Sequence, residues 1–264
     1  MINVLLAAAI ATAPIGEATP EQAADDARPA MFVVRDADTT VYIFGTFHAL
    51  DGHGDWFRDR VKTAFDSSGE LVLETVIPEG PVQVRPVFRG QPLPVTPSAS
   101  FLATTKMAIN AGKSQGMQVG NGADNVLRHV AEAQGKPVEG LETLELQLGM
   151  FSRMPPAKAA PRPRAGEPVD AMESMTRVMG DMQSAWKRGD QSVFVTMLGQ
   201  LEKASPDTYR MMFTERNARW ADWIAGRLQT PGTVFVAVGA GHLAGKDSVL
   251  VRLAQLGIPS ERMN

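Results

Sequence analysis

Two segments of the chain share one order of residue types, an apolar run followed by Gly-x-x-His. They are residues 41–48 (VYIFGTFH) and residues 235–242 (FVAVGAGH). The chain has four histidines, so His48 and His242, half of the total, lie in this one context. An imidazole changes charge near neutral pH and serves as a general base or as a metal ligand. These two histidines are therefore the first candidates for chemistry.

The elements around each histidine suit a ligand site. Each apolar run is typical of a buried β-strand, and an amphipathic helix is expected after it. In α/β sheets, ligands collect beyond the carboxyl ends of the strands, and glycine there allows a sharp turn and close approach. If the two strands are neighbours, His48 and His242 are expected to share one pocket; the alternative for either alone is an ordinary loop histidine. His53, in a polar turn, and His129, on a helix, are expected to be solvated.

Two glutamates occupy comparable positions. Glu74 follows the apolar residues 71–73, and a carboxylate at the end of a strand has the position of an acid, a base or a metal ligand. The alternative is an exposed glutamate with no role. The same two interpretations apply to Glu142. It could equally be a glutamate in the first turn of a helix, where its negative charge interacts favourably with the helix dipole.

A long helix expected over residues 208–228 supplies a further group. Arg216 and Trp220 are spaced i, i+4 and therefore share one helix face. One interpretation is an aromatic core stripe beside a solvated charged face. The other places Arg216 and Asn217 at the pocket, as a charge clamp and a hydrogen-bond donor, because a guanidinium is always charged and suits an anion or oxyanion.

The remaining pattern predicts an α/β fold with a central mixed sheet flanked by helices, two related strand–Gly-x-x-His–helix halves and an inserted helical block. Expected strands are residues 31–35, 40–44, 70–76, 136–141 and 234–238. Expected helices are residues 56–65, 100–111, 123–134, 142–151, 169–199 with a break at Gly189-Asp190, 208–228 and 246–256. Two proline-containing segments, 79–97 and 155–168, are expected to be a loop and a linker.

Composition restricts the class of protein. The 264 residues carry 26 basic and 29 acidic side chains, and this balance argues against a nucleic-acid-binding protein. The absence of cysteine excludes disulfides, thiol nucleophiles and cysteine-based metal centres.

The N-terminal residues suggest export. Residues 2–13 (INVLLAAAIATA) resemble the apolar core of a signal peptide and are too short to span a membrane. Residues 1–18 are expected to be a signal peptide, 19–30 a flexible leader and 31–264 a single domain. The mature protein is then periplasmic or secreted and has no stable membrane span. The alternatives are a start codon assigned a few residues late, or a disordered apolar tail.

The ordered set of motifs resembles the TraB/GumN family, whose relatives include the Tiki proteases and, more remotely, the erythromycin esterase and ChaN-like proteins. The set comprises Gly45-x-x-His48, Glu74, residues 135–143 (GKPVEGLET), residues 215–220 (ERNARW) and residues 239–243 (GAGHL). The resemblance runs from about residue 31 to residue 257. The sequence departs from the family pattern between residues 79 and 116.

The resemblance implies a pocket built from both Gly-x-x-His motifs and the strand-end glutamate. It makes His48, Glu74 and His242 the catalytic or metal-binding set, supported by Arg216 and Asn217. Two imidazoles and a carboxylate are a normal ligand set for a divalent metal, here Mn, Co or Zn.

Two hypotheses about function follow. The first is a hydrolase of the metal-dependent peptidase or esterase-like type, acting on a peptide or small molecule, in which a histidine can also serve as general base without a metal. The second is a non-catalytic periplasmic binding protein for a peptide, a metal or another small ligand.

Overall fold

A computed structural model describes residues 27–53, 55–77, 87–88, 91–92, 99–155 and 171–263. The expected signal peptide, most of the leader, and most of the segments 79–97 and 155–168 lie outside the described residues. Within the described part of the leader, Ala27 and Ala30 are buried against the fold.

The centre of the molecule is a six-stranded mixed sheet in the order β6-β3-β7-β2-β1-β8. Its strands are β1 (Met31–Arg35), β2 (Thr39–Thr46), β3 (Glu70–Thr75), β6 (Val138–Glu142), β7 (Gly232–Gly239) and β8 (Glu261–Met263). The four strands from β6 to β2 are parallel, whereas β1 is antiparallel to both of its neighbours. The predicted α/β class with a mixed sheet is confirmed. A separate antiparallel pair is formed by β4 (Val87–Phe88) and β5 (Gln91–Pro92).

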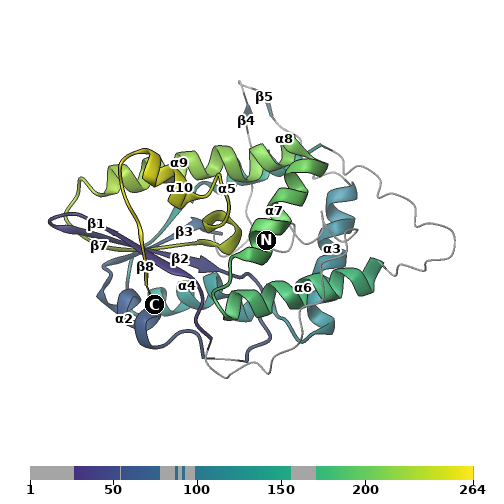
Figure 1. Ribbon diagram of the computed structural model, residues 1–264, viewed down its shortest axis with the longest axis horizontal. Coiled ribbons are helices and arrows are strands. Elements are labelled where there is room, and N and C mark those ends of the chain that lie inside the picture. The colour runs from purple at the N-terminus through teal and green to yellow at the C-terminus, as the bar shows by residue number, and fades with distance from the viewer. Residues whose placement is uncertain are drawn as a thin grey trace.

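Alternate residues of the central strands enter two different apolar layers, because successive side chains of a strand point to opposite faces. Phe44 and Phe235 belong to one layer, and Ile43 and Val236 belong to the other. Both faces are covered, and this explains why β2 and β7 read as nearly continuous apolar runs. Figure 1 shows α9 and α10 on one side of the sheet and α2 and α4 on the other.

Helices form the covering layers and a block beside the sheet. They are α2 (Asp59–Ser67), α3 (Ala99–Ser114), α4 (Ala123–Ala133), α5 (Leu144–Ser152), α6 (Ala171–Lys187), α7 (Ser192–Ala204), α8 (Pro206–Tyr209), α9 (Glu215–Arg227) and α10 (Val249–Gln255). The block of α3, α6 and α7 lies beyond the end of the sheet (Figure 1). Among the described residues, no helix has the length and apolar character that crossing a membrane requires.

The break expected at Gly189-Asp190 is present between α6 and α7, and Gly189 has the positive φ of 65° that glycine accommodates. Other expected boundaries shift. The long helix over residues 208–228 is α8, a π-helical turn over Arg210–Thr214 and then α9. Glu142 is the last residue of β6, so the interpretation of Glu142 as a residue in the first turn of a helix is wrong. β6 thus ends one residue later than expected, with Glu142 paired to Thr75 of β3, and β3 ends one residue earlier than expected.

Candidate active site

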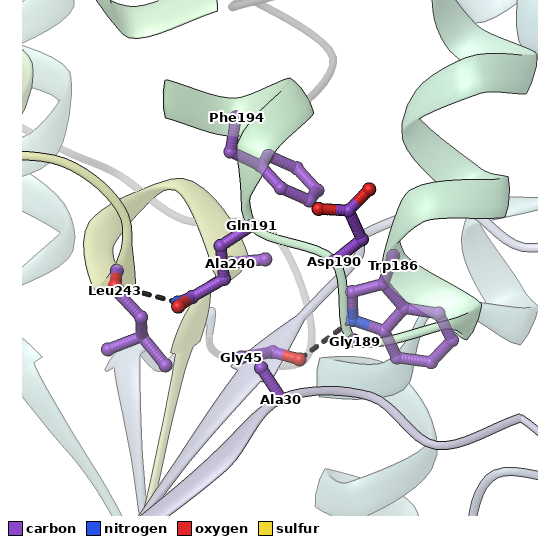
Figure 2. Close-up of a pocket in the computed structure, with 9 residues that line it drawn as sticks. All are labelled: Ala30, Gly45, Trp186, Gly189, Asp190, Gln191, Phe194, Ala240 and Leu243. Atoms are coloured by element: carbon purple, nitrogen blue, oxygen red, sulfur yellow. Dashed lines mark hydrogen bonds between the residues drawn. The ribbon is translucent and has the colours of Figure 1, made fainter. Parts of the chain in front are cut away.

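The two Gly-x-x-His motifs lie side by side, because β2 and β7 are parallel neighbours with Thr46 opposite Gly239. Gly45 makes this contact possible: a Cβ atom at that position would lie 3.3 Å from the Cα atom of Ala240. Trp186 fixes the first motif by donating from Nε1 to the carbonyl oxygen of Gly45 over 2.7 Å. Figure 2 shows this bond. The pocket that these residues line has a volume of only about 10 Å³. The backbone behind both motifs is therefore tightly packed.

The second motif is held from the same side. Gln191, in the turn between α6 and α7, donates from Nε2 to the carbonyl oxygen of Leu243 over 2.7 Å (Figure 2). The helical block thus reaches both motifs through two side chains from one short stretch of chain. One function of this block is to hold the ends of β2 and β7 in register.

His48 lies against Asp124, in the first turn of α4. Its Nδ1 atom is 2.9 Å from Asp124 Oδ1. Gly122 permits this approach, because a Cβ atom there would lie 2.3 Å from the carbonyl oxygen of His48. The N–H of Ala123 also donates to the carbonyl oxygen of Phe47 over 2.9 Å. The start of α4 is thereby fixed on the first motif.

The electrostatics of this pair favour a charged carboxylate. Burial by itself raises the pKa of Asp124, but the charge of His48 and the close contact with its ring lower that pKa below its ordinary value overall. Among the described residues, His48 Nε2 is buried without a hydrogen-bond partner, and the 2.9 Å contact of Nδ1 with Asp124 Oδ1 is an ion-pair contact that does not have hydrogen-bond geometry. The pair therefore has the arrangement of a general base held by a carboxylate, with one nitrogen left to accept a proton.

His48 lines a cavity of about 170 Å³. His48, Asp124 and Glu74 line it, together with Arg128 from α4. Its volume suits a water molecule and one group of side-chain size rather than a large ligand. Its remaining walls are Thr46, Leu73, Thr75, Ile77, Val119, Asn125, Gln147 and Ala237.

Glu74 connects this cavity to a buried network. Its Oε1 atom accepts from the backbone N–H of Gly239 over 2.7 Å, and its Oε2 atom accepts from Nη2 of Arg216 over 3.0 Å. Burial alone raises the pKa of Glu74, but the charge of Arg216, with smaller effects from the nearby His242 and His48 rings, holds that pKa well below its ordinary value. Both imidazoles are thus close enough to act electrostatically on one carboxylate.

Arg216 is completely buried and neutralises two glutamates. Besides Glu74, it contacts Glu142, which accepts from Nε over 2.8 Å. Glu142 also accepts from Nη2 of Arg219 over 2.9 Å. The guanidinium carbon lies 4.5 Å from the centre of the Trp220 ring, as the i, i+4 spacing indicated. Arg216 therefore clamps carboxylates of the protein itself, and it does not line the cavity.

His242 belongs to the same buried network. Asn217 donates from Nδ2 to the carbonyl oxygen of Asp247 over 2.7 Å, so its other amide atom, Oδ1, must accept. That oxygen lies 2.5 Å from Nδ1 of His242, which places the ring proton on Nδ1. The pKa of His242 is lowered to about 3: burial is the main cause, Glu74 opposes the shift, and the charge of Arg216 adds to it. His242 is therefore a neutral, fully buried ring behind the cavity.

The donor atoms that a divalent metal would need at Glu74 and His242 are already engaged with groups of the protein. Glu74 already accepts at both oxygens, and Nε2 of His242 faces Nη1 of Arg216 at 3.4 Å. Across the described residues, no three His, Asp or Glu side chains are arranged to hold an ion. In this arrangement the cation beside Glu74 and His242 is the guanidinium of Arg216, so these residues do not fit a metal as they stand. Binding of Mn, Co or Zn by His48, Glu74 and His242 stays a prediction.

The structure thus divides the candidate residues into two groups. His48 and Glu74 line the cavity, whereas His242, Arg216 and Asn217 form the buried support behind it. His53 and His129 are exposed, as expected. The spacing of residue types does not indicate Asp124 or Arg219, and it does not decide the role of Glu142.

A scan of protein families gives one match. The model described as the TraB/PrgY/gumN family covers residues 30–88 and 84–262. Comparisons with curated proteins and with solved structures give no match. The match spans most of the chain and includes both Gly-x-x-His motifs, Glu74 and the helix of Arg216. The chain belongs to the TraB/PrgY/gumN family.

Proposed function

We propose that this protein is a hydrolase that cleaves an amide or ester bond in a peptide or small molecule, with His48 as general base. The observation that carries the proposal is the contact of His48 Nδ1 with Asp124 beside a cavity onto which Glu74 also faces. Asp124 stabilises the imidazolium that forms when the ring accepts a proton, and it fixes the orientation of the ring.

The chemistry needs one water molecule and one carbonyl group in the cavity. His48 Nε2 takes a proton from the water as its oxygen attacks the carbonyl carbon, and the same proton then passes to the departing amine or alcohol. Arg128 lines the cavity wall, with Nε held by Glu132 over 2.7 Å and Nη1 donating to the carbonyl oxygen of Ile77 over 3.0 Å. From this position its guanidinium favours the carbonyl oxygen as negative charge develops. Glu74 retains further lone pairs and can accept a hydrogen bond from the attacking water.

His242, Arg216 and Asn217 act indirectly in this proposal. Arg216 and the N–H of Gly239 fix the carboxylate of Glu74 from two directions, and Asn217 fixes the ring of His242. These are positioning residues, because none of them lines the cavity. Preorganised polar groups of this kind hold a site in its reactive geometry.

The proposal is tested by turnover of a panel of aryl esters and short peptides. Wild-type protein, His48→Ala and the matched control His129→Ala are compared, each with and without a chelator. Wild type and His129→Ala are expected to hydrolyse at least one substrate class, and His48→Ala is expected to lose about 100-fold to 10,000-fold in rate. Saturable binding without any turnover would favour the binding-protein hypothesis instead.

The chelator arm separates two mechanisms. General-base catalysis by His48 predicts activity that survives chelation. Loss of activity on chelation, with recovery on adding Mn, Co or Zn, would instead support the metal set of His48, Glu74 and His242. Metal content of the purified protein gives the same answer independently of any substrate.

Export is part of the proposal, and it rests on the apolar residues 2–13. Protein isolated from the periplasm of its native host is expected to begin after Ala13 when its N-terminus is sequenced. An intact Met1 in the cytoplasmic fraction would contradict export and leave the hydrolase proposal untouched.

A further inference from the structure

The cavity that His48 lines has an apolar side as well as a polar one. Ile77 and Val119 both line it, and their side chains are 49% and 59% exposed. Leu73 and Ala237 line the same cavity and are buried. A single exposed apolar residue is ordinary, but two that line one cavity present apolar surface that a ligand can cover, and covering it removes that surface from water.

Helix α4 holds both exposed residues beside the proposed general base. Arg128 donates from Nη1 to the carbonyl oxygen of Ile77 over 3.0 Å. Asn125 donates from Nδ2 to the carbonyl oxygen of Gly120, the residue after Val119, over 3.0 Å. The first turn of the same helix carries the carboxylate that contacts the general base. The apolar surface is therefore fixed relative to the proposed reacting groups.

The charges at the cavity wall favour an uncharged ligand group. Each acidic or basic residue that lines the cavity contacts a side chain of the opposite class within the protein. These contacts are Glu74 with Arg216 at 3.0 Å, Arg128 with Glu132 at 2.7 Å, and Asp124 with His48 at 2.9 Å. A charged substrate group would have to compete with these contacts after losing its own hydration, and this is costly.

The volume of the cavity sets the size of that group. About 170 Å³ corresponds to about six groups of the size of a water molecule, at ~30 Å³ each. One attacking water and the two atoms of a carbonyl group take about three of these places, which leaves about three for carbon atoms of the substrate. The amine or alcohol has to leave the cavity, whereas the acyl group stays on the carbonyl carbon throughout the reaction.

We propose that Ile77 and Val119 determine the specificity of this site, and that the substrate carries an uncharged aliphatic chain of about three carbon atoms on the acyl side of the bond that is cleaved. This inference rests on the proposed function, because it places the chain beside the carbonyl group that water attacks with the help of His48. The two half-exposed side chains then become covered when the substrate binds.

Aryl esters that differ only in the acyl chain test the proposal. The quantity compared is kcat/KM of the full chain for the acetate and the butyrate, each divided by the uncatalysed rate constant of that ester. The butyrate is expected to be about 10-fold better, because it adds two methylene groups and each one that is buried improves binding about fourfold. Equal values for the two esters would overturn the inference.

Matched variants locate the preference. Val119→Thr keeps the branched shape and replaces one methyl group by a hydroxyl, so it is expected to lower the preference for butyrate about threefold and to change acetate little. Ile77→Thr provides a second test if Val119→Thr unfolds. Val195→Thr makes the same change on α7, at a 45% exposed residue that does not line the cavity, and is expected to keep the wild-type preference. Equal effects of Val119→Thr and Val195→Thr would contradict the assignment.

Methyl ketones cannot be hydrolysed, so they separate failure of this inference from failure of the proposed function. Titrations followed by NMR compare acetone, methyl propyl ketone and levulinate, in which a carboxylate ends the alkyl chain. Methyl propyl ketone is expected to bind about 10-fold more tightly than either of the others. That result without any ester turnover would refute hydrolysis and leave recognition of an apolar chain standing. Turnover with equal binding of all three would refute the apolar site and leave hydrolysis standing.

Discussion

Replacement of Arg216 by methionine removes the cation from a buried cluster. The guanidinium is fully buried, and the side chains of Glu74 and Glu142 are 8% and 2% exposed. In Arg216→Met, Glu142 keeps Arg219, and Glu74 keeps the N–H of Gly239 and the neighbouring His242 ring, whose Nε2 lies 3.7 Å from Oε1. Removing one partner of a buried ion pair costs about 3–5 kcal/mol. In a chain of this size that corresponds to a melting temperature lower by about 6–20 °C.

The assay is denaturant unfolding followed by circular dichroism at pH 7 and at pH 4.5. The folded-state pKa of Glu74 lies below its unfolded value in the wild type, so its contribution is complete at pH 7 and is lost only as the pH falls through the lowered pKa. In Arg216→Met the lowering effect of the guanidinium is gone, so burial raises the pKa of Glu74. As the pH falls, Glu74 then becomes protonated, and the cost of burying its unpaired charge disappears. The difference between variant and wild type is therefore expected to shrink at pH 4.5.

Arg177→Met is the matched control, because the Arg177 side chain is 68% exposed and pairs with Glu173 at 3.8 Å. It is expected to unfold like the wild type. If Arg216→Met is as stable as Arg177→Met at pH 7, the guanidinium does not compensate the two glutamates and the reasoning fails. A difference that does not change with pH would refute the assignment of the effect to Glu74.

Three further predictions concern the surroundings of the site. The pKa of His242 is about 3 in the folded protein, chiefly because the ring is buried, so as the pH falls below 6.5 the unfolded chain takes up a proton on His242 while the folded protein does not; the free energy of unfolding is therefore expected to fall by about 1.4 kcal/mol per pH unit. His242→Gln, measured by denaturation across pH 4.5–7, should remove that slope. An unchanged slope would contradict a neutral buried ring. Trp186→Phe loses the bond to Gly45 and is expected to cost about 1–3 kcal/mol, since a buried carbonyl is left unpaired; an unfolding midpoint equal to that of the wild type would contradict this. His53→Ala and His129→Ala change exposed side chains and should stay within about 0.5 kcal/mol of the wild type, and a larger loss for either would show an unrecognised contact.

Much of the fold could be predicted from local pattern. The apolar runs at residues 41–44 and 234–238 have the length and composition of buried strands, and both are central strands of the sheet. The break at Gly189 could be predicted because a glycine and an aspartate together interrupt a helical pattern. The end of β6 was placed wrongly, because Glu142 has no apolar neighbour after it to show that the strand continues.

The candidate site could be predicted only in part. His48 and His242 were found because each follows its strand directly, but nothing local indicates that one ring borders a cavity and the other is buried. Asp124 was missed because its relation to His48 exists only after Gly122 brings α4 against the first motif. The role of Arg216 could not be predicted for the same reason, because its two carboxylate partners come from separate strands. Tertiary contacts, rather than spacing, decide these roles.

The central claim is that His48 and Asp124 act as one catalytic unit, and a double-mutant cycle on kcat/KM tests it most directly. His48→Ala, Asp124→Asn and the double variant are measured on the best substrate of the panel, with circular dichroism to confirm folding. Because the two residues act as a unit, the double variant is expected to be little slower than His48→Ala alone. Losses that multiply, or full activity in folded His48→Ala, would contradict the account.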